Sequence, residues 1–211
     1  MNWRYVPRMR VTGLELGLFI ALLACFIVFM VIVFKSPGAV RGKKEKSPGP
    51  VRLGAILQSV SYMIAWTLRR PKVNPFGGGS LWPDVLIALL SLFAAAGAIA
   101  LAAVAKKHLG RQWALAARVV EGHQLVTDGP FGRVRHPLYL AMGILLLAPV
   151  IGLSSWPGAV LSVALFTVGT PLRTRAEESV LAETFGAEYE AYRKSVPAFL
   201  PCLRKDRGSN S

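Results

Sequence analysis

The 211-residue chain has few charged residues, few acidic residues and almost no cysteine or histidine. Charged residues make up 17% of it and hydrophobic residues 53%, against about 25% and roughly 45–50% in an ordinary soluble domain. This composition excludes a disordered or collagen-like chain and disfavours a water-soluble one. Two cysteines, Cys25 and Cys202, exclude a disulfide framework. Three histidines without ligand spacing indicate no metal site.

Acidic residues are outnumbered by basic ones, 11 to 25, which gives a net charge of +14. A basic balance is also typical of nucleic-acid-binding proteins. Here the basic residues fall between long uncharged runs, and they form no stripe that alternates with aromatic residues. We therefore expect no nucleic-acid partner.

The uncharged runs predict membrane-spanning helices, each of which needs about 20 residues. Residues 16–34 and 85–105 are uncharged over 19 and 21 positions. Residues 53–68 form a shorter run that carries Gln58, Ser59 and Ser61, and we expect these polar side chains to face other helices. Residues 137–172 contain no charge, and such a run would make about 54 Å of helix, enough for two spans.

The sequence from Ser154 to Gly158 predicts the turn between these last two spans, because Pro157 lacks a backbone donor and glycine is conformationally free. The first uncharged run is 19 residues long, which is longer than the apolar core of a signal peptide, and it continues nine residues beyond Cys25. We therefore expect it to be a retained transmembrane helix and not a cleaved signal. We therefore expect an all-α integral membrane protein with about five transmembrane helices.

The basic residues predict the orientation of these spans, since Lys and Arg favour cytoplasmic loops. With the amino terminus outside, the first and third loops and the carboxyl-terminal segment place 19 of the 25 basic residues on the cytoplasmic side. The carboxyl terminus is then cytoplasmic.

Two polar stretches, 121–139 and 173–201, flank the charge-free hairpin and therefore share its cytoplasmic side. In the second stretch an apolar stripe recurs at helical spacing, which predicts an amphipathic helix that lies on the membrane surface or caps the hairpin. The stripe consists of Leu181, Phe185, Tyr189, Tyr192 and Val196. Near it, Glu177 and Glu178 are close to the bilayer beside Arg173 and Arg175, where carboxylates are costly unless they are paired or bind a ligand.

At these stretches the sequence resembles the isoprenylcysteine carboxyl methyltransferase family and related membrane phospholipid methyltransferases. The family pattern G-H-x-L-V-T-x-G-x-Y-x-x-x-R-H-P-x-Y reads here from Gly122 to Tyr139, with Phe131 in place of the tyrosine. The second pattern, R-x-x-x-E-E followed by F-G, two tyrosines and V-P, reads from Arg173 to Pro197. The resemblance implies a division into residues 1–84 with two spans, a catalytic core at 85–203, and a tail at 204–211.

The resemblance also implies S-adenosylmethionine as the cofactor and assigns residues to it. Arg173 matches the position that binds substrate and, with Glu178, is the predicted catalytic pair. Phe131 lacks the hydroxyl of the tyrosine that the family has at this position. It could therefore still stack against the adenine of the cofactor but could not form a phenolic hydrogen bond. The implied cofactor contacts are His123, Gln124, Leu125, Val126, Phe131, His136, Pro137, Leu138, Tyr139 and Glu177.

The predicted reaction is methyl transfer to a lipid-like or lipidated acceptor at the cytoplasmic face. A carboxylate acceptor, as in isoprenylcysteine, is favoured because the fork of Arg173 binds carboxylates and an ionised carboxylate needs no general base. An amine such as phosphatidylethanolamine is the alternative, with Glu178 as proton acceptor. An alternative enzyme class is a sterol-type reductase that uses a nicotinamide cofactor. The alternative that is not an enzyme is a membrane scaffold or transporter subunit, in which the Glu/Arg cluster is only an ion-pair network. The oligomeric state is left open.

Overall fold

The computed structural model describes residues 13–35, 49–69, 82–110 and 125–200, and this part of the chain is helical apart from short connections and one isolated bridge between Arg69 and Ser154. The predicted all-α class is confirmed. The helices are α1 (Gly13–Phe34), α2 (Gly49–Thr67), α3 (Trp82–Leu109), the 3-10 helix η2 (Gly129–Gly132), α4 (Pro137–Gly152), α5 (Trp156–Phe185) and α6 (Ala187–Ser195).

The first three uncharged runs of the sequence each correspond to one helix, α1, α2 and α3. The run 137–172 is divided between α4 and α5, as expected. The position of the turn differs from the expectation. Ser155 is the N-cap of α5 and accepts a hydrogen bond from the Gly158 N–H, so Trp156, Pro157 and Gly158 are already helical. Proline fits the first helical turn because the N–H that it lacks has no partner there.

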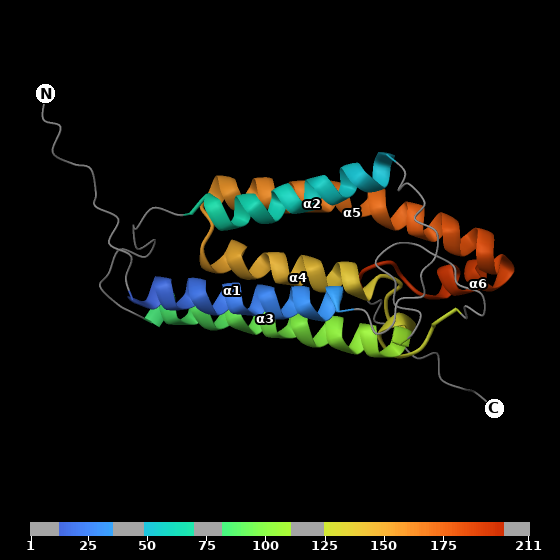
Figure 1. Cartoon of the computed structure of the whole chain (residues 1–211), viewed down its shortest axis with the longest axis horizontal. Coiled ribbons are helices and arrows are strands. Elements are labelled where there is room, and N and C mark those ends of the chain that lie inside the picture. Colours follow the sequence, from blue (N-terminus) through green and yellow to red (C-terminus); the bar gives the residue numbers. More distant parts are fainter. Residues whose placement is uncertain (1–12, 36–48, 70–81, 111–124, 201–211) are drawn as a thin grey trace, which may run out of the picture.

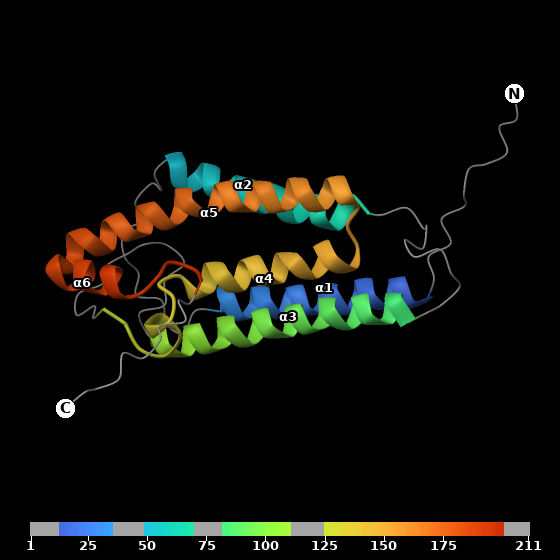
Figure 2. The ribbon, with the colours of Figure 1, turned by 180° about the vertical axis from the view of Figure 1, so that it is seen from behind.

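The helices α1 to α5 run in alternating directions and form two layers (Figures 1 and 2). One layer holds α2 packed along α5, and the other holds α1, α3 and α4. The first residue of α4, the last turn of α3 and the short helix α6 therefore meet at the same end of the bundle (Figure 1). This is the end at which both polar stretches of the sequence gather.

Two glycines allow α2 and α5 to approach closely. A Cβ added at Gly54 would lie 2.6 Å from the Gly169 carbonyl oxygen, and one added at Gly169 would lie 2.8 Å from the Gly54 carbonyl oxygen. Polar bonds join the same two helices, since the hydroxyl of Ser61, which is fully buried, donates to the Ser162 carbonyl at 2.7 Å. Ser61 and Gln58 thus face other helices as predicted, whereas Ser59 is exposed.

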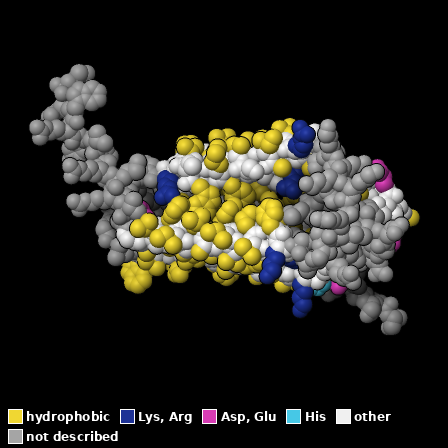
Figure 3. Space-filling view, in the orientation of Figure 1, with side chains coloured by type: hydrophobic (Ala, Val, Ile, Leu, Met, Phe, Trp, Pro, Cys, Tyr) yellow, Lys and Arg dark blue, Asp and Glu magenta, His cyan; other side chains and the backbone are white. Residues whose placement is uncertain are grey.

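Large hydrophobic side chains are exposed along the bundle, while much of the buried core consists of alanine. Figure 3 shows hydrophobic side chains over the middle of one face and Lys and Arg side chains towards its ends. Two helices in the described ranges, α1 and α3, are long and apolar enough to cross a bilayer. An apolar exterior of this extent suits contact with lipid and not with water.

The prediction of one helix for the apolar stripe from Leu181 to Val196 is wrong, because the stripe is divided between α5 and α6. Gly186, with φ of +51°, separates α5 from α6, and glycine adopts this left-handed backbone at no steric cost. On α6 the stripe faces protein, because Tyr189 and Tyr192 are 1% and 8% exposed and the Tyr192 hydroxyl donates to the Phe131 carbonyl at 2.7 Å. The helix therefore caps the end of the bundle, and its contact with a membrane surface stays a prediction.

Candidate functional site

The Glu178 carboxylate on α5 joins both polar stretches. Its Oε1 atom accepts hydrogen bonds from Nε and Nη2 of Arg135, at 3.1 and 2.8 Å, and lies 2.9 Å from Nε2 of His136. The Glu178 and Arg135 side chains are only 16% and 12% exposed. The His136 hydrogen bond and the Arg135 guanidinium together lower the pKa of Glu178 to about 2, against the opposing effect of burial. Glu178 is therefore ionised at neutral pH.

The segment after α6 holds the Arg-His pair from the other side. The backbone N–H groups of Arg135 and His136 donate to the carbonyls of Pro197 and Ala198 at 2.8 and 3.0 Å. The Phe199 ring lies 5.6 Å from the His136 ring, centroid to centroid. His136 is 4% exposed as a result. Its ring is fixed at the N-terminus of α4, where it caps the helix without a side-chain cap bond.

Glu177 differs from its neighbour in its surroundings. Its carboxylate is 38% exposed, and its Oε2 lies 4.0 Å from Nδ1 of His136. Partial burial raises the pKa of Glu177, and the neighbouring His136, Tyr139 and Arg173 oppose this rise. Because His136 directs Nε2 to Glu178, its Nδ1 atom faces Glu177. One imidazole thus bridges a paired carboxylate and an accessible one.

Arg173 lies one helical turn before Glu177 on α5. Its guanidinium carbon is 5.1 Å from the centroid of the Tyr139 ring, and its Nη1 donates to Oε1 of Gln58 on α2 at 2.7 Å. Its Nε atom is buried and has no hydrogen-bond partner. A buried donor without a partner is rare in folded proteins and calls for an explanation.

The structure brings together His136, Tyr139, Arg173, Glu177 and Glu178 from the predicted set. Pro137 is buried in the first turn of α4 and Leu138 is half-buried beside it. Leu125, Val126 and Phe131 are half-buried in and before η2, and no hydrogen bond or ring contact among the described residues joins their side chains to His136. His123 and Gln124 lie outside the described residues.

Three contributors to the site were missed by the sequence reasoning. Arg135 was predicted only as part of a motif, although its position beside His136 at one end of the hairpin, with Glu177 and Glu178 at the other, could have indicated an ion pair. Gln58 was expected to face a helix, but nothing in the sequence linked it to Arg173. Phe199 lies beyond the V-P end of the pattern, and no sequence signal marked it.

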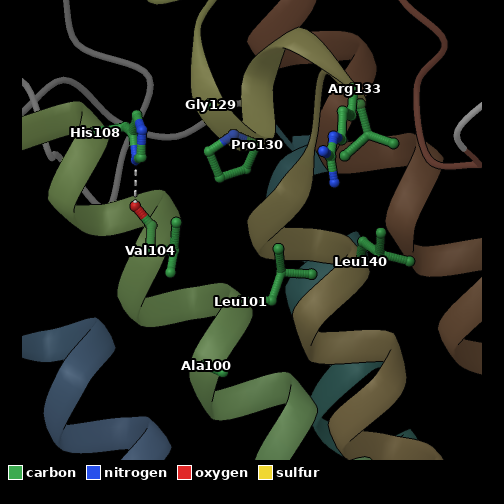
Figure 4. A pocket seen from close by; sticks show the side chains of 9 residues that line it. Ala100, Leu101, Val104, His108, Gly129, Pro130, Arg133 and Leu140 are labelled. Carbon is green, nitrogen blue, oxygen red and sulfur yellow. Dashed lines mark hydrogen bonds between the residues drawn. The ribbon is translucent and has the colours of Figure 1, made fainter.

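A separate groove lies between α3 and η2, and Figure 4 shows that apolar side chains line most of it. His108 stands at one end, where its Nδ1 is 2.8 Å from the Val104 carbonyl oxygen. None of His136, Arg173 or Glu177 lines this groove. Its lining residues are Ala100, Leu101, Val104, His108, Gly129, Pro130, Arg133, Val134 and Leu140.

Comparison with known protein families gives a match over the segment that contains most of the site residues. Residues 88–183 match the profile of the isoprenylcysteine carboxyl methyltransferase (ICMT) family. Through this segment the chain is similar to the ICMT family. The segment contains α4 and nearly all of α5, and hence His136, Arg173, Glu177 and Glu178. The similarity to the ICMT family and the apolar helices both point to a membrane protein.

Three curated relatives carry different names. The chain is 34% identical over 89 residues, 42% of its length, to the protein-S-isoprenylcysteine O-methyltransferase of Schizosaccharomyces pombe. It is 35% identical over 137 residues, 64% of its length, to the cobalt-zinc-cadmium resistance protein CzcN of Cupriavidus metallidurans. It is 38% identical over 79 residues, 36% of its length, to the methanethiol S-methyltransferase of Pseudomonas deceptionensis.

The aligned parts span 38%, 60% and 28% of these three relatives, in the same order. The chain therefore covers less than two thirds of the length of each of these relatives. Within the described residues no group of three or more His, Cys, Asp or Glu side chains is placed to hold a metal ion.

Proposed function

We propose that the chain is an S-adenosylmethionine-dependent membrane methyltransferase that methylates an anionic group, most favourably a carboxylate, on a lipid-like acceptor. The match of residues 88–183 to the ICMT family and the two relatives named as methyltransferases support this class of reaction. The observation that carries it is the position of Arg173, whose buried Nε has no partner, one turn from the accessible Glu177 carboxylate.

The residues present fit the cofactor. S-adenosylmethionine carries hydroxyl and amino donors, a carboxylate and a positively charged sulfur. Glu177 is partly exposed and offers acceptor oxygens, while the first N–H groups of α4, after Pro137, belong to the helix end that favours anions. Leu138 and Tyr139 lie in this same turn. The half-buried Leu125, Val126 and Phe131 would add apolar surface, and His123 and Gln124 stay predictions.

The chain's own residues would orient and not activate the acceptor. When bound, S-adenosylmethionine supplies a methyl group on a sulfonium, and an anionic acceptor can take it without losing a proton first. Arg173 would hold the anion through the free edge of its guanidinium, whose planar fork matches a carboxylate. Correct positioning can supply much of the rate acceleration in such a reaction.

An amine acceptor is less well supported. Amine attack requires a proton acceptor, and Glu178, the predicted candidate, is held ionised by Arg135 and His136 with a pKa of about 2. A carboxylate with so low a pKa is a weak base at neutral pH. We therefore assign Glu178 to the positioning of His136 and Arg135 and keep Arg173 as the substrate-binding residue.

We further propose that α1 to α5 are five transmembrane helices, with the site on the cytoplasmic side. Their alternating directions (Figures 1 and 2) and the exposed apolar side chains support this arrangement. The sequence predicts that 19 of the 25 basic residues are cytoplasmic, in the segments that follow α1, α3 and the apolar part of α5. These three helices run towards the end of the bundle that carries the site. A cofactor from the cytoplasm and a lipid-like acceptor from the bilayer could then meet at the same place, with membrane lipids as the surrounding partners.

Calorimetry of the detergent-purified protein tests the cofactor. We expect heat of binding with S-adenosylhomocysteine and none with NADPH; heat only with NADPH, or with neither, would contradict the proposal. Methyl transfer from labelled S-adenosylmethionine into a total lipid extract tests the acceptor. Base treatment releases volatile label from a methyl ester but leaves N-methyl and S-methyl products intact, so base-stable label would overturn the carboxylate assignment.

A further inference from the structure

Gln58 on α2 makes a buried connection to the site from outside the family segment. It is 2% exposed, and α2 precedes the matched residues 88–183. A buried amide must satisfy its donors and acceptor within the protein. The Gln58 side chain makes one bond through its nitrogen, to Thr170, and one through its oxygen, from Arg173, and both partners are on α5.

The hydrogen bonds around Gln58 have a single consistent direction. The Thr170 hydroxyl donates its only proton to the Phe166 carbonyl at 2.7 Å. It must therefore accept from Nε2 of Gln58, which lies 2.9 Å away. This fixes the amide so that its oxygen, Oε1, accepts from Nη1 of Arg173 at 2.7 Å.

The close packing of α2 and α5 makes this geometry rigid. A Cβ added at Gly169 would lie 3.4 Å from Cγ of Gln58, and one added at Gly54 would lie 2.8 Å from Cγ of Arg173. The two glycines thus leave space for the stems of both side chains. Gln58 and Arg173 are confined at their stems as well as at their polar ends.

Gln58 is neutral, so it orients Arg173 without cancelling its charge. Among the described residues no carboxylate forms an ion pair with Arg173 within 4.0 Å, although Glu177 lies one turn away and interacts with it at longer range. The Tyr139 ring is a further neighbour of the Arg173 guanidinium. Its Nε remains buried and unpaired. A carboxylate at position 58 would still accept from Arg173 and would cancel its charge, whereas the Thr170 hydroxyl would have to turn and donate to it.

We propose that Gln58 is a positioning residue that holds Arg173 without a direct ion pair, so that the guanidinium binds the anionic group of the acceptor. This inference rests on the proposed function for its last step. It gives α2, for which the sequence provided no role, a part in selecting an anionic acceptor over a neutral or cationic one.

A stability cycle tests the pairing without any acceptor. Gln58→Glu should keep the melting temperature of the purified protein within a few degrees of wild type, because Arg173 neutralises the new carboxylate. In the Arg173→Met background the same substitution should lower the melting temperature strongly, since it buries an unpaired charge. Gln58→Met, similar in size and uncharged, is the control in both backgrounds. Equal effects of Gln58→Glu in both backgrounds would overturn the proposal.

A binding experiment tests the consequence for the acceptor. The probes are N-acetyl-S-farnesylcysteine with a free carboxylate, its methyl ester, and laurate with methyl laurate as a second acid and ester pair. Gln58→Glu should weaken binding of the acids at least tenfold while the esters change less than twofold. Equal weakening of acid and ester, or no weakening of either acid, would overturn the proposal. The Gln58→Glu variant should bind S-adenosylhomocysteine as wild type does. If wild type itself did not bind it, the proposed function would be contradicted. The stability cycle would in that case still test the pairing of Gln58 with Arg173.

Discussion

Nε2 of His136 lies 2.9 Å from Oε1 of Glu178, and this contact ties the N-terminus of α4 to the extension of α5 beyond the bundle. The same carboxylate oxygen accepts two N–H groups of Arg135. With one imidazole nitrogen committed in this way, Nδ1 is the nitrogen left to face Glu177 at 4.0 Å. The two adjacent glutamates therefore have different tasks, one structural and one available to a ligand.

This division predicts a separation of cofactor binding from turnover. Glu177→Gln should weaken binding of S-adenosylhomocysteine by about tenfold or more, because a charge-assisted hydrogen bond contributes about 1.5–3 kcal/mol. Arg173→Lys should bind it as wild type does but lose most of kcat/KM, since lysine lacks the planar fork. Calorimetry and labelled methyl transfer measure the two effects. Glu188→Gln, on the exposed face of α6, is the control; loss of cofactor affinity in Arg173→Lys would contradict the roles assigned.

The acid stability of the protein should depend on Glu178. Its pKa is about 2 in the folded protein, below the ordinary 4.5, so its stabilising contribution is present above pH 4.5 and is lost as the pH falls towards 2. At about 1.36 kcal/mol per pKa unit this amounts to about 3 kcal/mol at most. Glu178→Gln should lower the melting temperature at pH 7 and flatten its fall between pH 5 and pH 3. An unchanged slope would show that Glu178 makes no such contribution, and Glu188→Gln again serves as the control.

The close approach of α2 and α5 should not tolerate a methyl group. In Gly54→Ala the new Cβ would lie 2.6 Å from the Gly169 carbonyl oxygen and 2.8 Å from Cγ of Arg173, which should cost about 1–3 kcal/mol and displace Arg173. Gly97→Ala on α3 is the matched control, because nothing lies within 4 Å of its Cβ. It should be neutral or stabilising by about 0.5–1 kcal/mol. Thermal unfolding in detergent compares the two, and equal melting temperatures would contradict the packing described.

The orientation can be tested in intact cells by cysteine labelling. In a background with Cys25→Ser and Cys202→Ser, a membrane-impermeant maleimide should label Ser80→Cys from outside. It should label Ser47→Cys and Ser209→Cys only after lysis, because the first loop and the tail carry the basic residues that favour the cytoplasm. Labelling of all three before lysis, or the reverse pattern, would contradict the proposed topology.

Much of the site was predictable because its residues come from two short stretches at the ends of one helical hairpin. A run without charges must form helix when its backbone is removed from water, and two helices joined by a short turn return to the same side. His136, Arg173 and Glu177 could therefore be placed together from sequence alone. The break at Gly186 was missed because apolar spacing alone does not show where a helix ends.

By itself the sequence determined the all-helical class, the positions of α1 to α5, and the pairing of the two polar stretches, since these follow from local hydrophobicity and from spacing along the chain. Only the tertiary structure decided which of the two glutamates is paired, that Phe199 covers His136, and that Gln58 holds Arg173. Gln58 and Arg173 are 115 positions apart. Contacts over such a separation depend on how helices pack, which here rests on the space left by Gly54 and Gly169, and no local pattern of residues encodes it.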